Sequence, residues 1–290
     1  MSKLYHYCNA SAFASIIGER SIWLSSLSLS NDTMEGKLVG ATFKTLFQKN
    51  NLDEQRAATV MNALKQLEEL IDGLGFCLSE EGDILSQWRG YSQDGHGFSI
   101  GFSKEYLEML PEKKEESENG FSLRQMIYDP KEQENALEPI FSQIMQDIKD
   151  GKLDMPYPPT LLTGYGDPTA NEKYEKEKNR YLDAIKHMTF KILPTMFHMF
   201  TLKNNAFKEE KEWRLISYLL KGHEDKCDFR ISGNRLTPYR SFLLKKLDIP
   251  VIKEVILGPK NITPEFVVRK FLQQNGFSDV SVIRSSATYR

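Results

Sequence analysis

Residues 75–102 read GFCLSEEGDILSQWRGYSQDGHGFSIGF and contain two strand patterns on either side of a segment rich in aromatic and polar residues. Residues 75–79 have the composition of a short strand, and Phe98, Ile100 and Phe102 alternate with small or polar residues as in a second strand. The segment between them carries aromatic side chains at helical spacing. The stretch therefore predicts two strands joined by a segment that can present aromatic rings.

Strand patterns also lie on both sides of this stretch, while helical patterns fill the middle of the chain. Strand composition predicts further strands at residues 4–8, 21–25, 212–220, 226–232, 250–257 and 279–285. Apolar residues at helical spacing predict helices around residues 60–71, 137–148 and 173–200, the last kinked or broken at Pro194. Regular alternation of strands and helices is absent, which argues against a doubly wound parallel sheet.

The chain is predicted to be an α+β protein with a single domain over residues 1–290. No internal repeat and no clean linker divides it, so we interpret the helical stretches at about 40–73 and 104–200 as insertions. The strands near the two ends are expected to pair within one sheet system. Residues 154–172 are rich in Pro, Gly and Thr and predict a long loop, a feature that is often functional.

Composition excludes several classes of protein. Hydrophobic residues make up 40% of the 290 residues, which is enough for a substantial core. The net charge of −2 gives no whole-chain reason to expect binding to nucleic acid or to a membrane. The 3 cysteines form no CxxC pair, which argues against a zinc or disulfide framework. Without a signal-peptide pattern or a long apolar window, we expect a cytoplasmic protein that does not enter the membrane.

His6 is the first candidate functional residue. In an extended LYHYC segment, Leu4, His6 and Cys8 share one face and the two tyrosines take the other. A histidine on a first strand can present its imidazole to a cleft. The structural alternative is a core histidine that donates to a backbone carbonyl, and residue preferences leave the two interpretations about equal.

Trp88 and Tyr91 form the second candidate. Their three-residue spacing in SQWRGY places both rings on one face of a helical turn. Aromatic faces can stack on a nicotinamide or a base. Core packing is the alternative, and it is favoured by the general prevalence of aromatic side chains in protein cores.

Glu212 and Arg214 form the third candidate. On a strand, alternation places these two side chains on one face and Trp213 and Leu215 on the other. A carboxylate beside a guanidinium could be a catalytic or ribose-binding group. The alternative is a charge pair that protects the edge of a sheet, and before any resemblance is considered this alternative is slightly favoured.

The NDTMEG segment at residues 31–36 is a weaker candidate. Asn31, Asp32 and Glu35 supply oxygens, but a calcium-type site would need more of them, so helix capping is the favoured interpretation. A Walker A loop, a strand-linked GxGxxG, GxSxG and HExxH are all absent from the sequence, and no metal ligand set is predicted.

Five motifs in order carry a resemblance to a known family. They are YHYCNASAFASII with SIWLSS and NDTMEG, the 76–102 stretch, FKEEKEWRLI, EVILGPK and VIRSSATYR. In this order the chain resembles a widespread bacterial family of unknown function, the domain of unknown function 2971, from about Leu4 to Arg290. Departures from the family's pattern are small. Gln87 and Arg89 flank Trp88 at positions where other side chains are usual, and Cys8 stands where Thr or Ser is more usual.

A second resemblance concerns activity. The opening strand, helix and strand are similar to the start of ADP-ribosyltransferase-like enzymes, whose split β-sheet core binds NAD in a cleft. This resemblance implies that His6 contacts the adenosine-side ribose, that Tyr91 or Trp88 packs on the nicotinamide, and that Glu212 bonds the nicotinamide ribose. Arg214 would orient Glu212 or meet a pyrophosphate oxygen. It implies an enzyme that cleaves NAD and transfers ADP-ribose to a nucleic-acid or protein acceptor, as a toxin or phage-defence effector.

Two other functions compete with this hypothesis. The hypothesis of an NAD-using enzyme predicts that His6, Tyr91 and Glu212 converge in one pocket. An enzyme directed at nucleic acid or nucleotide phosphates would instead gather basic side chains near His6, namely Arg20, Arg89, Arg214 and Arg240. A non-catalytic recognition module would leave the candidate residues buried and mutually satisfied.

Overall fold

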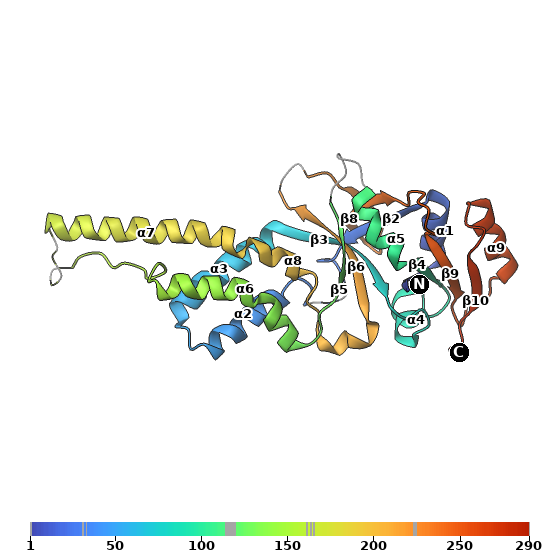
Figure 1. Ribbon diagram of the computed structural model, residues 1–290, viewed down its shortest axis with the longest axis horizontal. Coiled ribbons are helices and arrows are strands. Elements are labelled where there is room, and N and C mark those ends of the chain that lie inside the picture. The colour runs from blue at the N-terminus through green and yellow to red at the C-terminus, as the bar shows by residue number, and fades with distance from the viewer. Residues whose placement is uncertain are drawn as a thin grey trace. The chain divides into compact units, whose positions relative to one another are not determined.

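The computed structural model describes residues 2–30, 32, 34–113, 120–160, 162, 164, 166–222 and 225–289. The chain divides into two compact units (Figure 1). The first unit comprises residues 1–33, 72–126 and 204–290, and the second comprises residues 34–71 and 127–203. The predicted α+β class is confirmed. The interpretation as one domain with two insertions stays a prediction, and the second unit draws its helices from both of the predicted stretches.

Strands of the described residues form one 10-stranded sheet. The strands are β1 (Lys3–Cys8), β2 (Ser21–Ser26), β3 (Ile71–Ser79), β4 (Phe98–Ser103), β5 (Ser122–Gln125), β6 (Glu212–Leu220), β7 (Asp228–Ser232), β8 (Arg235–Leu243), β9 (Ile252–Leu257) and β10 (Ser281–Arg284). Their order is β10-β9-β4-β1-β3-β2-β8-β7, and β6 pairs with both β3 and β5. Strands from both ends of the chain thus share one sheet, as the sequence predicted.

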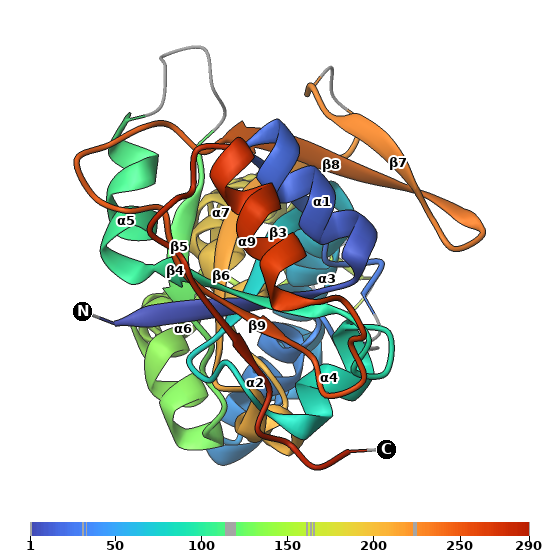
Figure 2. The ribbon, with the colours of Figure 1, turned by 90° about the vertical axis from the view of Figure 1, so that its right-hand side faces the viewer.

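One face of the sheet carries the main apolar core of the first unit. Helices α1 (Ala10–Glu19), α5 (Lys104–Met109) and α9 (Glu265–Gln274) contribute to this core, and Figure 2 shows α1 and α9 side by side in front of the strands. On the sheet side, Leu24, Ile100 and Phe102 are fully buried. Phe13 of α1 stacks on Phe98 of β4 with ring centroids 4.2 Å apart. We call this the core face, and alternate residues of β1, β2, β3 and β4 contribute to it.

The opposite face of β1 packs against α4 (Leu85–Tyr91). Tyr5 and Tyr7 alternate with the core-facing residues of β1, and the rings of Tyr7 and Trp88 make an edge-to-face contact with their centroids 4.9 Å apart. The short helices η1 (Leu110–Lys113) and η3 (Asn205–Glu210) complete the first unit. The segment at residues 75–102 therefore gives one strand to each side of β1 and a helix to the face opposite the core.

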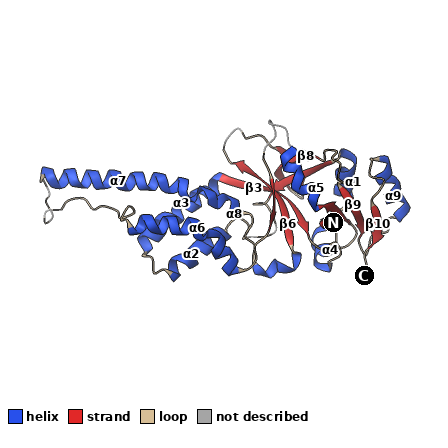
Figure 3. Ribbon diagram, viewed as in Figure 1, coloured by secondary structure: helices blue, strands red, loops and turns tan. Residues whose placement is uncertain are grey.

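The second unit is helical (Figure 3). It contains α2 (Leu38–Lys49), α3 (Glu54–Leu70), α6 (Pro130–Lys149), α7 (Pro168–Ile192), η2 (Leu193–Thr195) and α8 (Met196–Met199). The rings of Phe43, Phe47 and Phe141 cluster where α2 meets α6. The break predicted at Pro194 is confirmed, because α7 ends at Ile192 and a 3₁₀ turn follows. Among the helices of the described residues, none is long and apolar enough to cross a membrane.

Strand β8 is not among the strands predicted from the sequence, although it links β2 to β7. Its residues RLTPYRSFL bury Thr237, Arg240 and Phe242, which do not follow a period of two. Pro238 also argues against a strand in sequence. Tertiary pairing on both edges holds a segment whose own pattern is weak.

Gly97→Ala should destabilise the first unit. A Cβ at Gly97 would lie 2.1 Å from the carbonyl oxygen of Cys8, where backbone rather than a flexible side chain has to move. We expect a loss of about 1–3 kcal/mol in the free energy of unfolding, measured by urea denaturation.

The matched control is Gly18→Ala in α1, where a Cβ meets nothing within 4 Å. Alanine is preferred to glycine in helices by up to about 1 kcal/mol, so this variant should be as stable as the parent or more stable. Equal stability of the two variants would contradict the close approach at Gly97.

Candidate functional site

The sheet forks at β3. Tyr5 of β1 pairs with Ser79, while β2 pairs further back, at Gly75 and Leu74. The carbonyl of Gly73 accepts from Leu27, and the amide of Glu80 donates to Lys211 just before β6. Because peptide groups of alternate residues point to opposite edges of a strand, β1 and β2 share one edge of β3 and β6 takes the other. The two strands on the shared edge separate around Cys77.

His6 lies at this fork. Its Nδ1 is 2.8 Å from the carbonyl oxygen of Cys77, and its ring stacks on Phe76 at a centroid distance of 4.0 Å. A carbonyl only accepts hydrogen bonds, so Nδ1 carries the proton and Nε2 of the neutral ring is an acceptor. This is the contact that the structural interpretation of His6 predicts. His6 pairs with Ile100 across β4, so its side chain is on the core face.

Burial controls the charge of His6. Desolvation lowers the pKa of the imidazole to about 4, the positive charge of Arg230 lowers it further, and the bond to Cys77 opposes the shift. The ring is therefore neutral at pH 7. Arg230 of β7 is a basic side chain that the sequence analysis did not select.

Glu212 and Arg214 form a buried, bidentate ion pair at the start of β6. Nε of Arg214 donates to Oε1 of Glu212 over 2.6 Å and Nη2 donates to Oε2 over 3.0 Å. The Glu212 and Arg214 side chains are 6% and 3% exposed. Trp213 and Leu215, the alternate residues of the strand, pack in the main core. The Glu212–Arg214 pair is therefore on the opposite face of the sheet, which we call the polar face. Since β6 has β3 and β5 on its two edges, the interpretation as protection of a sheet edge is wrong.

Tyr91 is brought to the same region as this pair. Its hydroxyl donates to Oε1 of Glu210 over 3.2 Å, and the side chain remains 47% exposed at the end of α4. Glu210 is buried, and its backbone carbonyl accepts from the hydroxyl of Ser79 over 2.7 Å. Sequence reasoning missed Glu210 because it stands in the charged run KEEKE, which looks like a solvated surface.

Trp88 has a different environment. Its ring is fully buried, and Nε1 donates to Asp83 over 2.7 Å. Asp83 also accepts hydrogen bonds from Ser285 and Ser286 near the end of the chain. Burial opposes ionisation of Asp83, but these hydrogen bonds together lower the pKa of its carboxyl below the usual value. Trp88 therefore anchors α4 and the C-terminal segment, and its ring has no open face.

The four arginines of the phosphate-directed hypothesis have separate surroundings. Arg20 donates to the carbonyl of Asn275, Arg89 lies over the ring of Tyr289, and Arg240 pairs with Asp225. Arg214 is held by Glu212.

The NDTMEG segment does not cap the helix that follows it. The N-cap of α2 is Lys37, and it makes no side-chain capping hydrogen bond, so the capping interpretation is wrong. Asn31 lies outside the described residues. Asp32 belongs to the first unit and the buried Glu35 to the second.

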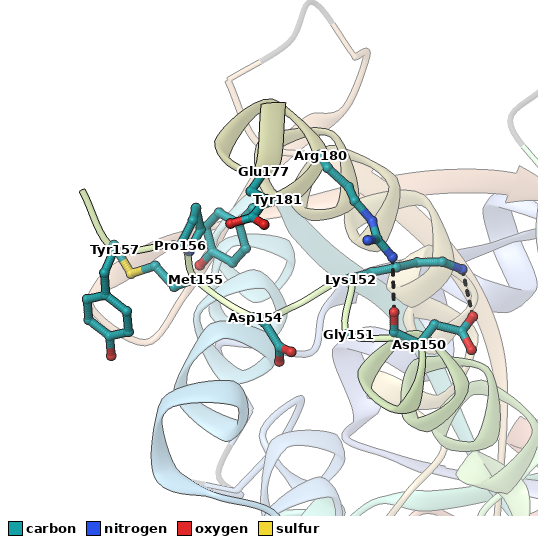
Figure 4. A pocket seen from close by; sticks show the side chains of 10 residues that line it. All are labelled: Asp150, Gly151, Lys152, Asp154, Met155, Pro156, Tyr157, Glu177, Arg180 and Tyr181. Atoms are coloured by element: carbon teal, nitrogen blue, oxygen red, sulfur yellow. Dashed lines mark hydrogen bonds and ion pairs between the residues drawn. The ribbon is translucent and has the colours of Figure 1, made fainter. Parts of the chain in front are cut away.

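The second unit contains a cavity of about 450 Å³ (Figure 4). It lies between the segment after α6 and the helix α7, and its lining residues are Asp150, Gly151, Lys152, Asp154, Met155, Pro156, Tyr157, Glu177, Arg180 and Tyr181. Lys152 pairs with the Asp150 carboxylate at 3.1 Å, and Arg180 donates to the Asp150 carbonyl over 3.0 Å. Lys152 and Arg180 therefore both bond to Asp150, another residue that lines the cavity. None of the candidate residues His6, Trp88, Tyr91, Glu212 and Arg214 lines this cavity.

Comparison with known families bears on the same region. Residues 87–215 match the model of a family described as protein of unknown function (DUF2971). The match begins in α4 and ends in β6, so it includes Tyr91, Glu210 and the Glu212–Arg214 pair. It supports the family resemblance drawn from the sequence motifs. No curated protein and no solved structure matches the chain. The roles assigned to the candidate residues stay predictions.

Loss of stability at mildly acid pH should depend on His6. An unfolded histidine has a pKa of about 6.5, whereas that of folded His6 is about 4. Between these values the unfolded chain binds a proton that the folded chain does not. The stability that the neutral His6 ring contributes to the fold is fully present above about pH 6.5 and is lost as the pH falls towards 4. Urea unfolding of the parent and of His6→Asn at several pH values should give a shallower pH dependence for the variant; identical slopes would contradict the assignment.

Removing one member of the Glu212–Arg214 pair should be costly. Arg214→Leu leaves a buried carboxylate without its bidentate partner, and we expect a loss of about 3–5 kcal/mol in the free energy of unfolding. Glu212→Gln keeps an acceptor for Arg214 and should lose less. The double variant with Leu at both positions should recover part of the loss. A double variant less stable than either single variant would contradict a coupled pair.

Proposed function

We propose that this protein is an ADP-ribosyltransferase-like enzyme that cleaves the nicotinamide–ribose bond of NAD, with Glu212 as its catalytic carboxylate. The observation that carries the proposal is the bidentate hold of Arg214 on Glu212, on the sheet face to which Tyr91 is also drawn. A carboxylate fixed by two hydrogen bonds has one orientation before any ligand arrives. Fixed charges of this kind are the main means by which enzymes stabilise a transition state.

The chemistry requires a negative charge near the ribose. As the bond to nicotinamide breaks, positive charge develops on the ribose, and the departing nicotinamide takes the bonding electrons. A carboxylate at that point stabilises the transition state more than the uncharged ground state of the ribose. A carboxylate oxygen can accept more than one hydrogen bond, so a ribose hydroxyl can donate to Glu212 in the proposed complex.

Tyr91 and Trp88 have different parts in this proposal. Tyr91 has an exposed ring within hydrogen-bonding reach of Glu210, two residues before Glu212, and is the aromatic group suited to pack on nicotinamide. Trp88 is buried behind it and acts as a positioning residue for α4.

His6 retains the role that the resemblance assigns to it, as a contact for the adenosine-side ribose. With Nδ1 bound to Cys77, its neutral ring offers Nε2 to a ribose hydroxyl. His6 is on the core face and Glu212 is on the polar face, so a ligand that touches both has to reach through the fork between β1 and β2. The ADP-ribose would pass to a nucleic-acid or protein acceptor.

The test is binding and turnover of NAD by the purified full-length chain. Calorimetry measures binding up to millimolar NAD, and chromatography measures release of nicotinamide. Glu212→Gln should still bind NAD but should lose about 100-fold or more in the rate of release, as when one transition-state contact is removed. Tyr91→Ala should weaken binding, and Tyr91→Phe should weaken it less because the ring remains.

Glu209→Gln is the matched control, because Glu209 is an exposed carboxylate three residues before Glu212. It should behave as the parent does. Thermal unfolding of every variant separates loss of the fold from loss of activity. Absence of NAD binding by the parent, or full activity of Glu212→Gln, would overturn the proposal.

A further inference from the structure

Arg230 is a half-buried arginine that pairs with no carboxylate among the described residues. Its Nε donates to the hydroxyl of Ser25 on β2 over 3.1 Å. The other four of the five N–H groups of a guanidinium are left for another acceptor. Burial lowers the pKa of Arg230 from its ordinary value, as expected for a cation that lacks an anion in a partly dry place.

The pattern of β7 is inverted around this residue. Phe229 and Ile231 point to solvent and are 63% and 79% exposed, while Arg230 between them points inward. An ordinary strand would bury the apolar pair and expose the arginine. A local inversion of this kind is expected where function overrides packing.

Thr237 is a second unsatisfied donor at the same place. It is directly opposite Arg230 in the β7–β8 pair, so the two side chains share one face. Thr237 is 4% exposed, and its hydroxyl oxygen is buried with no hydrogen-bond partner. Buried hydroxyls in folded proteins nearly always have a partner, so this one requires an explanation.

An aromatic pair flanks these donors. Trp23 of β2 stacks on Tyr239 of β8 with ring centroids 4.4 Å apart. Tyr239 is opposite Ser25 in the β2–β8 pair, and Trp23 and Ser25 alternate with the core residues Ile22 and Leu24. The aromatic pair and the donors are therefore on the polar face, the same face as Glu212.

Register along β3 relates this group to Glu212. Ser25 pairs with Gly75 of β3. At the other end of β3, the carbonyl of Lys211 accepts a hydrogen bond from the amide of Glu80, and Glu212 is the next residue. From Gly75 to Ser79 the strand advances roughly 13 Å at about 3.3 Å per residue. The two places are therefore separated by about 13 Å along β3, and the side chain of Leu27 packs over Gly75 between them.

We propose that Ser25, Arg230 and Thr237 form a binding site for the diphosphate of a nucleotide, with Trp23 and Tyr239 beside it for an attached ring. Arginine presents several N–H donors in a plane that matches phosphate oxygens. Two hydroxyls supply further donors, and His6 nearby is neutral and adds no competing charge. The nucleotide assignment rests on the proposed function. The phosphate site rests on the contacts of Arg230 and Thr237.

Binding of inorganic pyrophosphate and of ADP to the full-length chain tests this site by calorimetry. Arg230→Gln should weaken both by tenfold or more. Arg230→Lys should give an intermediate loss, because the charge remains and the planar donor set does not. Thr237→Val keeps the shape of the side chain and should weaken binding a few-fold. Thermal unfolding checks that each variant is folded.

Arg235→Gln is the matched control, since Arg235 is an exposed arginine on the same hairpin, bonded to the carbonyl of Leu29. Binding within about twofold of the parent is expected. No binding of pyrophosphate or ADP by the parent at millimolar concentration would overturn the site. So would equal losses in Arg230→Gln and Arg235→Gln, or Arg230-dependent binding of a single-stranded oligonucleotide but not of either small ligand.

Glu212→Gln separates this inference from the proposed function. Its binding of pyrophosphate should equal that of the parent. If the parent binds pyrophosphate through Arg230 but does not cleave NAD, the phosphate site stands and the proposed function falls. If NAD is cleaved while Arg230→Gln binds pyrophosphate and NAD normally, the proposed function stands and the phosphate site falls.

Discussion

The pairing of β3 with three strands is the constraint on which the first unit depends. A strand has two edges, so β1 and β2 have to share one of them while β6 takes the other. The shared edge opens where the two strands diverge, and the imidazole of His6 bonds the backbone there. Strand pairing leaves the carbonyl of Cys77 to a side chain, and the His6 ring supplies its hydrogen bond.

The same pairing separates the chemistry of the two faces. Alternation along β2, β3 and β6 directs Leu24, Phe76 and Leu215 to the core face. It directs Ser25 and the Glu212–Arg214 pair to the polar face. A buried ion pair is expensive to desolvate and is a weak source of stability. Arg230, without a carboxylate among the described residues, extends this polar face across β7 and β8.

Sequence patterns predicted the parts of this arrangement that depend on local alternation. The strand at the start of the chain, the strand that begins at Glu212 and the break at Pro194 all follow from spacing or backbone chemistry. The alternation also placed Glu212 and Arg214 on one face correctly. Spacing placed Trp88 and Tyr91 on one side of a helical turn, but it could not tell which ring is buried. That depends on the packing of β1 against α4, where Tyr5 and Tyr7 cover Trp88.

Local sequence patterns were enough to predict the α+β class, most of the strands and the sharing of one strand face by Glu212 and Arg214. These depend on neighbours within a few residues, where the geometry of the chain is periodic. Three features became visible only in the folded chain: β8 is a strand, Tyr91 bonds Glu210, and His6 and Glu212 are on opposite faces. Each of these depends on contacts between residues far apart in the chain, and local periodicity holds no information about which distant segments will pair.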